Sequence, residues 1–377
     1  MHPSAPDALT SAVTDRIPLS PRTERYRAGV PDDAAGSRVS TLEDVALVAG
    51  VSRASVSRVV NGKPGVAAHI VEAVNDAIAR TGYVPNRAAR ALVTRRSNTV
   101  LVVVSGSDAS RAGPWGPGDV LADPFFGRVA GGLMSSLRPR DVHPVLMLAV
   151  TDDERSRVVS YVREGSADGV LLVSAEAGDP LPQLLTDAGV PVVLFSRPDH
   201  PLPLSYVDVN NRAGGALAAD RLVARGCRSV GIVTGPLEVP GAEDRLVGFR
   251  EAMARHGVAY VPSAAGTFSV ESGVAAMNAL LDQHQVDGVF ASNDNMAVGA
   301  ILAAQERGLT VPDDVAVVGF DDSTAALMCR PTLTTVRQPI ETMAAEMARL
   351  LLERLDAPDQ RPSAAIFEPA LVERGSA

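Results

Sequence analysis

The chain has 377 residues, 46% of them hydrophobic and 21% charged, which is ordinary for a soluble protein and long enough for two or three domains. Two cysteines exclude a disulfide-based scaffold and a four-cysteine zinc site. The net charge of −9 is uneven, because nine basic and four acidic residues between Arg38 and Ser97 give that segment +5 and leave −14 for the rest. A basic module on an acidic body is typical of a nucleic-acid contact, although a solvated charged face has the same balance.

Residues 1–37 have mixed charge and no apolar periodicity. They contain five prolines: Pro3, Pro6, Pro18, Pro21 and Pro31. This composition predicts a disordered tail, and a later translation start near Val30 or Val39 is the alternative. The N-terminus lacks the basic start and apolar stretch of a secretory signal, and no apolar run reaches the roughly 18 residues of a membrane span. We therefore expect a cytoplasmic protein.

Residues 40–62 predict two short helices joined by a tight turn. Thr41 with Asp44 matches the looser form of a capping box, and Gly50 ends the first helix. The apolar positions between them share one helical face: Leu42, Val45, Ala46 and Ala49. Ser52 can cap a second helix over Arg53–Val60, which Asn61-Gly62 ends.

A third helix follows. Four apolar residues spaced four apart predict one buried stripe: Val66, Ile70, Val74 and Ile78. Gly82 then ends this helix. Three short helices with a glycine turn between the first two predict a helix-turn-helix module.

From Asn98 the pattern changes to alternating strands and helices. Seven short apolar runs predict buried parallel strands: Val100–Val104, Val145–Leu148, Val170–Val173, Val192–Phe195, Val230–Val233, Val289–Ala291 and Val315–Phe320. Amphipathic stretches of about a dozen residues separate them, so we expect two doubly wound α/β halves. The segment 105–122 is long and rich in Gly and Pro, which favours either a lid or a disordered insertion.

Enzyme motifs are absent from the sequence. We find no G-x-x-x-x-G-K-[ST], no G-x-G-x-x-G after a strand and no G-x-S-x-G. The six histidines lack metal-ligand spacing, and Asn293-Asp294-Asn295 lacks the glycine of a calcium loop. Asp321-Asp322 does not make an acid/base pair, since consecutive side chains rarely face the same atom. We therefore expect neither catalysis nor a cofactor.

The segment TLEDVALVAGVSRASVSRVVN (41–61) closely resembles the DNA-binding module of the LacI/GalR (lac repressor) family of transcription regulators. The resemblance continues through GYVPNRAARAL (82–92). It covers the body at DPFF (123–126), DG (168–169), VDVNN (207–211), ASND (291–294), VGFDD (318–322) and PTLTTVRQ (331–338). Only the tail and the 105–122 segment lie outside it.

The resemblance implies a fold. An all-α helix-turn-helix domain would occupy 38–97, with a hinge helix at 87–94. An α/β body resembling a periplasmic binding protein would follow at 98–377 as two doubly wound lobes. We assign about 98–208 and 323–337 to the N-lobe. We assign about 209–322 and 338–366 to the C-lobe.

The second helix is the predicted DNA reader. After a glycine turn it can lie in the major groove with Arg53, Ala54 and Ser55 at base edges. Arg53 suits guanine, and Ala54 suits a thymine methyl group. The alternative for the arginines is a solvated face. The resemblance adds further DNA contacts: Thr41, Ser52, Ser57, Arg58 and Asn61 on bases or backbone, Tyr83 and Asn86 on phosphates, and Arg87, Ala89 and Leu92 in the hinge.

Leu92 is the expected wedge into the minor groove, a known way to kink DNA. The alternative is that it packs on the core. A short hinge segment rich in alanine is marginal as an isolated helix, so we expect it to fold only when paired on DNA.

The resemblance also implies a ligand cleft between the lobes. Phe126, and less directly Phe125, would stack on an apolar ligand face. Arg245 would clamp hydroxyl groups, as a guanidinium can. Polar contacts would come from Asn293, Asp321 and Arg197. Ser196 replaces an aspartate common in the family, and the alternatives are that Asn293 and Asp321 only cap turns and that Phe125 is core.

Together these features predict a ligand-responsive DNA-binding regulator. We expect a homodimer on a near-palindromic operator, with a sugar-like effector and genes of sugar transport or catabolism under its control. No leucine heptad follows the body, so a tetramer is not expected. The alternatives are the solute-binding protein of a transporter, a regulator whose ligand is not a sugar, an α/β enzyme, and an architectural DNA-binding protein that no ligand controls.

Overall fold

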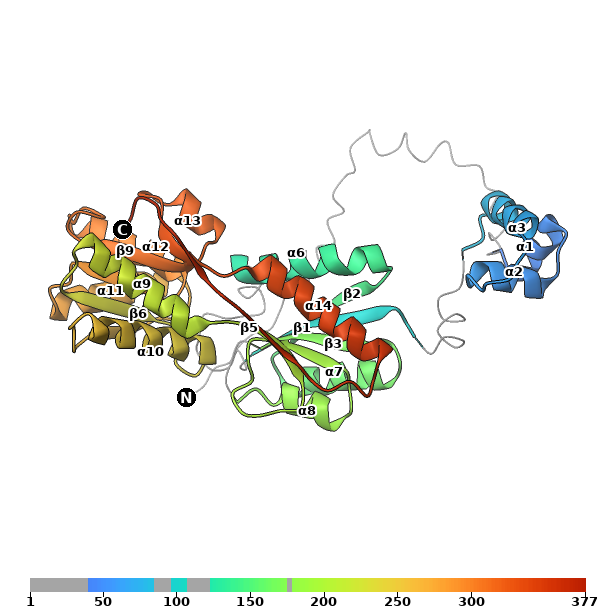
Figure 1. Ribbon diagram of the computed structural model, residues 1–377, viewed down its shortest axis with the longest axis horizontal. Helices are drawn as coiled ribbons and strands as arrows, with labels where there is room; N and C mark the ends of the chain where they lie inside the picture. Colours follow the sequence, from blue (N-terminus) through green and yellow to red (C-terminus); the bar gives the residue numbers. More distant parts are fainter. Residues whose placement is uncertain (1–39, 85–95, 107–122, 175–177) are drawn as a thin grey trace, which may run out of the picture. The chain divides into compact units, whose positions relative to one another are not determined.

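The computed structural model describes residues 40–84, 96–106, 123–174 and 178–377 (Figure 1). The described chain forms a helical unit and, from residue 96 onward, an α/β body. The predicted tail, the hinge helix at 87–94 and most of the 105–122 segment lie outside these residues. Among the described helices, none combines the length and the apolar character needed to cross a membrane.

The helical unit has the three predicted helices: α1 (Leu42–Ala49), α2 (Arg53–Val60) and α3 (Ala68–Thr81). Thr41 and Asp44 form the predicted capping box at α1, and Ser52 caps α2 by accepting the Ser55 N–H at 3.1 Å. Gly50 ends α1 with φ 66°, a left-handed conformation that glycine adopts at little cost. The core consists of Val45, Ala46, Val56, Val74, Ala77 and Tyr83.

The predicted start of the third helix was wrong. Val66 lies before α3 and is only half-buried, and the fully buried positions of α3 are Val74 and Ala77. The reason is Ala67, the N-cap residue, whose φ of −63° and ψ of 142° are extended, so the helix begins only at Ala68.

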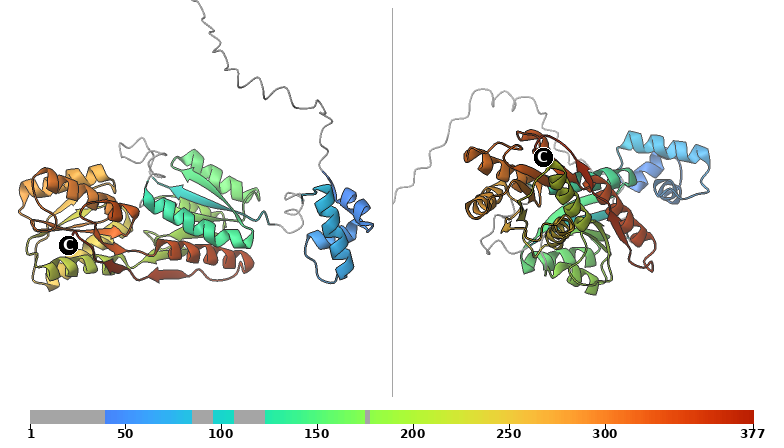
Figure 2. Two further views of the ribbon diagram at one scale, coloured as in Figure 1. Left: turned by 90° about the horizontal axis from the view of Figure 1, so that it is seen from above. Right: turned by 60° about the vertical axis from the view of Figure 1, so that its left-hand side comes forward.

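The N-lobe contains a six-stranded parallel sheet in the order β11-β5-β4-β3-β1-β2. Its strands are β1 (Thr99–Ser105), β2 (His143–Ala149), β3 (Gly169–Ser174), β4 (Val192–Phe195), β5 (Ser205–Val209) and β11 (Ala364–Phe367). Its helices are α6 (Pro124–Leu137), followed by the short 3-10 helix Arg138–Arg140, then α7 (Asp152–Arg163), α8 (Leu181–Asp187) and α14 (Ile340–Asp356). Helices α6 and α14 lie side by side on one face of the sheet, and α7 and α8 cover the other (Figures 1 and 2).

The C-lobe contains a second sheet in the order β12-β10-β9-β8-β6-β7. Its strands are β6 (Val230–Thr234), β7 (Ser263–Ala265), β8 (Gly288–Ala291), β9 (Ala316–Asp321), β10 (Thr334–Arg337) and the antiparallel β12 (Ala370–Val372). Its helices are α9 (Asn211–Arg225), α10 (Pro240–Arg255), α11 (Val270–Gln283), α12 (Asp294–Glu306) and α13 (Thr324–Met328). Helices α9 and α10 pack as one pair and α11 and α12 as another.

Two segments lie in the opposite lobe from the prediction. Segment 323–337 belongs to the C-lobe, because β10 pairs with β9. Segment 338–366 belongs to the N-lobe, because α14 packs on α6 and β11 pairs with β5. The sequence pattern did not predict five strands: β5, β7, β10, β11 and β12. They are short and lack the uninterrupted apolar run that is typical of a central strand.

The pair α9 and α10 packs with almost no separation between backbones. A Cβ atom added to Gly248 would lie 2.1 Å from the carbonyl oxygen of Arg212, and one added to Gly215 would lie 2.2 Å from that of Arg245. Both distances are far below van der Waals contact. The two glycines therefore set the distance between the helix that begins at Asn211 and the helix that carries Arg245.

Candidate DNA-binding and ligand-binding sites

Helix α2 presents the predicted reading face. Ser52, Arg53, Ala54 and Arg58 are exposed, and Ser55 and Ser57 are half-buried. Val56 is fully buried, as predicted for a core position. The polar side chains on this helix are therefore available to DNA, while its valines pack against the core of the helical unit.

Several of these side chains also make local bonds. Nε of Arg53 lies 2.8 Å from a carboxylate oxygen of Glu43, and both side chains are mostly exposed. An exposed pair of this kind contributes less than about 1 kcal/mol, so it can open for a phosphate or a base. Asn61 donates to the carbonyl oxygen of Ser57 at 2.8 Å and closes the end of α2.

The remaining predicted DNA contacts divide into two groups. Thr41 is half-buried and caps α1, and the Tyr83 ring belongs to the core, with 9% of the residue exposed. Their DNA contacts stay predictions. The second group lies outside the described residues: Asn86, Arg87, Ala89 and Leu92.

A cavity of about 310 Å³ lies between the two lobes of the body. The carboxyl ends of strands from both sheets meet there, which is where α/β proteins place ligands. Five of the six predicted ligand residues line it: Phe125, Phe126, Arg245, Asn293 and Asp321. Its other polar and aromatic lining residues were not predicted: Ser105, Asp123, Phe195, Ser196, Asp208, Asn211, Glu238, Phe268 and Gln338.

Three phenylalanines form one wall of the cavity. The ring of Phe125 stands edge-on to Phe126 and to Phe195, with centroids 5.2 Å and 5.3 Å apart. This T-shaped arrangement is a favourable one for aromatic rings. Phe125 thus packs against the core and also lines the cavity, so the predicted ligand contact and the core alternative are compatible.

Arg245 also lines the cavity and is held by several contacts. Its Nε donates to Asn211 Oδ1 at 2.8 Å and its Nη1 to the carbonyl oxygen of Ser292 at 2.6 Å. Its Cζ lies 3.7 Å from the centroid of the Phe320 ring, a cation–π contact. Burial lowers its pKa, but an arginine stays protonated. The guanidinium is therefore a fixed donor beside the cavity.

Carboxyl groups face this arginine. Asp321 is 8% exposed and accepts a hydrogen bond from Gln338 Nε2 at 2.5 Å. Burial raises the pKa of Asp321 to about 8, and it also raises the pKa values of Asp123 and Asp208. These carboxyl groups can accept hydrogen bonds from ligand hydroxyls, and a protonated one can also donate.

Asp294 lies just outside the cavity, with 1% of the residue exposed. It accepts Thr335 Oγ1 and the Ser323 N–H, each at 2.6 Å. Burial raises its pKa to about 7. Two buried aspartates therefore have native pKa values well above the ordinary 3.8.

These pKa values predict a stability that falls as pH rises. Between about pH 4 and 8 the native state holds protons that the unfolded chain has lost, so the free energy of unfolding decreases across this window. In Asp294→Asn, the decrease between pH 5 and 8.5 should be smaller by about 3 kcal/mol, since the two units between pH 5 and the native pKa of about 7 correspond to about 1.4 kcal/mol each. Urea unfolding at several pH values measures this, and parallel curves for the two proteins would contradict it.

Asn293 lines the cavity but is already bonded within the protein. Its Oδ1 accepts the Met296 N–H and caps α12, as the capping alternative predicted. Its Nδ2 donates to the carbonyl oxygen of Phe268 at 2.9 Å. Phe268 has a φ of 66°, so this bond holds an unfavourable backbone in place. Asn293 thereby positions a cavity aromatic that sequence reasoning missed.

Arg197 is the predicted ligand residue that does not line the cavity, as far as the described residues show. Its Nη2 lies 2.7 Å from Asp244 Oδ2 on α10. Its backbone N–H donates to Asp208, which does line the cavity. The side chain connects the lobes because the loop after β4 brings it alongside α10. The sequence alone did not predict this pairing, since the two residues are far apart in the chain.

The helix-turn-helix unit and the two-lobed body with its cavity define a DNA-binding regulator with a ligand-sensing domain. Residues 41–86 match the model of bacterial regulatory proteins of the lacI family, and residues 201–377 match that of the periplasmic binding protein-like domain. The HTH-type transcriptional regulator CelR of Thermobifida fusca is 42% identical, covering 90% of this chain and 98% of the relative. The ribose operon repressor of Escherichia coli (strain K12) is 31% identical, covering 90% and 100%.

Solved structures agree. A CelR–cellobiose complex has 40% sequence identity and a TM-score of 0.69, over 90% of this chain and all of that one. A lac repressor dimer bound to operator and the anti-inducer ONPF has 26% identity and a TM-score of 0.76, over 90% and 99%. The chain belongs to the LacI family and is a DNA-binding transcription regulator rather than an enzyme. The matching DNA-binding module also excludes a transporter's solute-binding protein.

Proposed function

We propose that this chain is a cytoplasmic, homodimeric repressor of genes for sugar uptake or breakdown, and that a neutral sugar of disaccharide size releases it from its operator. The observation that carries the ligand class is the convergence of the phenylalanine wall with Arg245 and Asp321 on one cavity. Aromatic rings cover the C–H face of a sugar, and planar polar groups pair with its hydroxyls. The similar CelR was solved with cellobiose.

The charge of the cavity supports a neutral ligand. Among its described lining residues are four acids, Asp123, Asp208, Glu238 and Asp321, and one arginine, Arg245. Even with Asp321 protonated, the other three acids outnumber Arg245, so an anion would meet a surplus of carboxyl groups in a partly dry site, where charge repulsion is strong. Hydroxyl groups instead find many acceptors.

Calorimetric titration tests the ligand class. We expect cellobiose to bind and to raise the melting temperature, because a ligand that binds the native state stabilises it. Its phosphorylated form should bind at least about tenfold more weakly through charge repulsion alone. A protein that binds nucleobases or sugar phosphates but no neutral saccharide would refute the proposal and favour the non-sugar alternative.

Exposed apolar side chains support a dimer. Met134 and Leu146 of the N-lobe, and Leu302, Leu327 and Met328 of the C-lobe, are all more than 40% exposed. They lie on contacting elements, Met134 and Leu146 on α6 and β2 and the other three on α12 and α13, and neighbouring exposed apolar side chains are typical of an interaction surface. A two-fold dimer matches a palindromic operator, and we expect light scattering to give a dimer mass, with weaker association in Met328→Asp.

Arg53 carries the prediction for DNA. Replacing it with alanine should weaken binding to a selected genomic operator by about 5- to 150-fold, the value of one good bidentate base contact, and should relax selection at one base pair. Arg163→Ala is the matched control, since Arg163 is an exposed arginine at the end of α7 in the body. Equal losses for both variants in fluorescence anisotropy would mean that Arg53 supplies only charge.

A further inference from the structure

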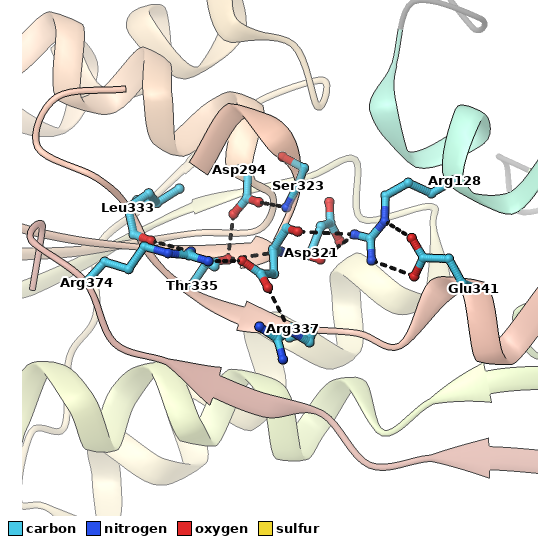
Figure 3. A network of polar contacts seen from close by, with 10 residues as sticks. Arg128, Asp294, Asp321, Ser323, Leu333, Thr335, Arg337, Glu341 and Arg374 are labelled. Carbon is cyan, nitrogen blue, oxygen red and sulfur yellow. Dashed lines mark hydrogen bonds and ion pairs between the residues drawn. The ribbon is translucent and has the colours of Figure 1, made fainter. Parts of the chain in front are cut away.

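The end of strand β9 has an unusual backbone. Asp321 and Asp322 have φ values of 108° and 54°, so two consecutive residues with side chains adopt positive φ. Each costs free energy relative to an ordinary conformation and persists only where its surroundings impose it. The groups that impose it here come from both lobes (Figure 3).

The C-lobe holds the second residue of this pair. The Asp322 carboxylate accepts Arg337 Nε at 2.6 Å and Arg374 Nη2 at 2.5 Å. Arg337 is the last residue of β10, and Arg374 lies two residues after β12 of the same sheet. Both bonds come from residues of the C-lobe, and Figure 3 shows Arg337 and Arg374 close to this segment.

The N-lobe holds the first residue. Arg128 of α6 donates through Nη1 to the backbone carbonyl oxygen of Asp321 at 2.8 Å. Glu341 of α14 orients the guanidinium with two bonds, Nε to Oε1 at 2.7 Å and Nη2 to Oε2 at 2.9 Å. A bidentate pair of this kind fixes direction as well as distance, so Arg128 is a rigid strut from one lobe to a strained residue of the other.

Asp321 has a second role through its side chain. The carboxyl group lines the cavity, whereas Arg128 is not among the described lining residues. Arg128 therefore binds the backbone of Asp321, while the side chain of the same residue faces the cavity.

We propose that Arg128 is a positioning residue: from the N-lobe it holds the Asp321 carbonyl, presents the Asp321 carboxyl group to the ligand, and ties the angle between the lobes to occupancy of the cavity. This rests on the proposed ligand site. A ligand held by Asp321 favours the arrangement that the strut also favours, so the strut strengthens the effect of ligand on the operator.

The test compares Arg128→Gln, Arg128→Lys and Arg349→Gln. Arg349 pairs with Glu346 and Glu353 of its own helix α14, so its loss removes an ion pair within the N-lobe. We expect Arg128→Gln to bind cellobiose about tenfold more weakly, the value of a lost charged hydrogen bond. Its ligand-induced change in operator affinity should shrink by a similar factor, because the ligand then shifts the lobes less. Arg128→Lys should recover part of both effects, and Arg349→Gln should match the wild type.

A measurement without ligand completes the test. In hydrogen–deuterium exchange, Arg128→Gln should exchange faster at Asp322 and Ser323, and Arg349→Gln should not. Unchanged exchange would overturn the inference whatever the ligand is. If the wild type responds to cellobiose and Arg128→Gln responds equally, the inference fails alone. If the wild type shows no response to cellobiose, the ligand proposal fails, and exchange alone decides whether Arg128 holds this segment.

Discussion

Replacing Arg245 with methionine is expected to abolish the response to ligand while operator binding stays at wild-type strength. Methionine keeps much of the side-chain volume but removes every N–H group that faces hydroxyls. Each charged hydrogen bond contributes about 1.5–3 kcal/mol, so losing two should weaken binding at least about 100-fold. The DNA-binding helices belong to the other unit of the chain, so the variant should remain on its operator when sugar is added.

Arg250→Met on the same helix is the control. Arg250 is exposed and its Nη2 reaches Ser263 Oγ at 3.1 Å, so the substitution is identical but leaves the cavity unchanged. Calorimetry gives the sugar affinity, and circular dichroism checks that both variants fold. Arg245→Met binding the sugar within about threefold of the wild type would mean that Arg245 is a structural residue, bonded to Asn211 and Ser292.

Gly248→Ala should be among the most destabilising single substitutions in the body. The new methyl group would lie 2.1 Å from the Arg212 carbonyl oxygen, and two packed helices must separate to admit it. Overpacking of this kind costs about 1–3 kcal/mol, and more where the obstacle is backbone. We therefore expect a loss of at least about 3 kcal/mol in the free energy of unfolding. The shift of Arg245 should also weaken ligand binding.

Gly131→Ala makes the same chemical change with the opposite expectation. Gly131 is an exposed residue of α6, and an added Cβ meets nothing within 4 Å. Alanine favours a helix over glycine by about 0.5–1 kcal/mol, so this variant should be slightly more stable. Urea unfolding midpoints compare the two. A similar small effect at both positions would show that α9 and α10 separate readily.

The local structure of the DNA-binding unit was largely predictable. Its helix boundaries depend on neighbouring residues, such as the Ser52 cap and the left-handed Gly50, which a sequence displays directly. The error at Val66 came from extending the helical periodicity back past Ala67, which is the extended N-cap residue of α3. The central strands were equally predictable, since strands buried on both faces are uninterrupted apolar runs.

The crossings between the lobes could not be predicted in the same way. Strand β10 (TTVR) and strand β11 (AAIF) are short, and only their partners, β9 and β5, determine the lobe to which each belongs. Long-range pairing of this kind leaves little trace in local composition. It reversed the assignment of two segments, and it hid the role of Arg197, whose partner Asp244 lies in the other lobe.

The cavity falls between these cases. The family resemblance indicated Arg245 and Asp321, and the structure brings both to one cavity. The resemblance did not indicate Phe268 or Arg128. Phe268 follows an edge strand of three residues, and Arg128 acts through a backbone carbonyl rather than a side chain. A signal for the missed lining residues did exist, since Ser105, Phe195 and Asp208 lie at the carboxyl ends of β1, β4 and β5.

The most direct test of ligand-controlled DNA binding is the affinity of the purified protein for its operator with and without saturating cellobiose. The operator is first selected from sheared genomic DNA as a recurrent palindrome. We predict that cellobiose weakens operator binding by about 5- to 150-fold and that operator DNA weakens cellobiose binding by the same factor, as linkage requires. An operator affinity that neither cellobiose nor any other neutral sugar changes would contradict control by a sugar in this cavity.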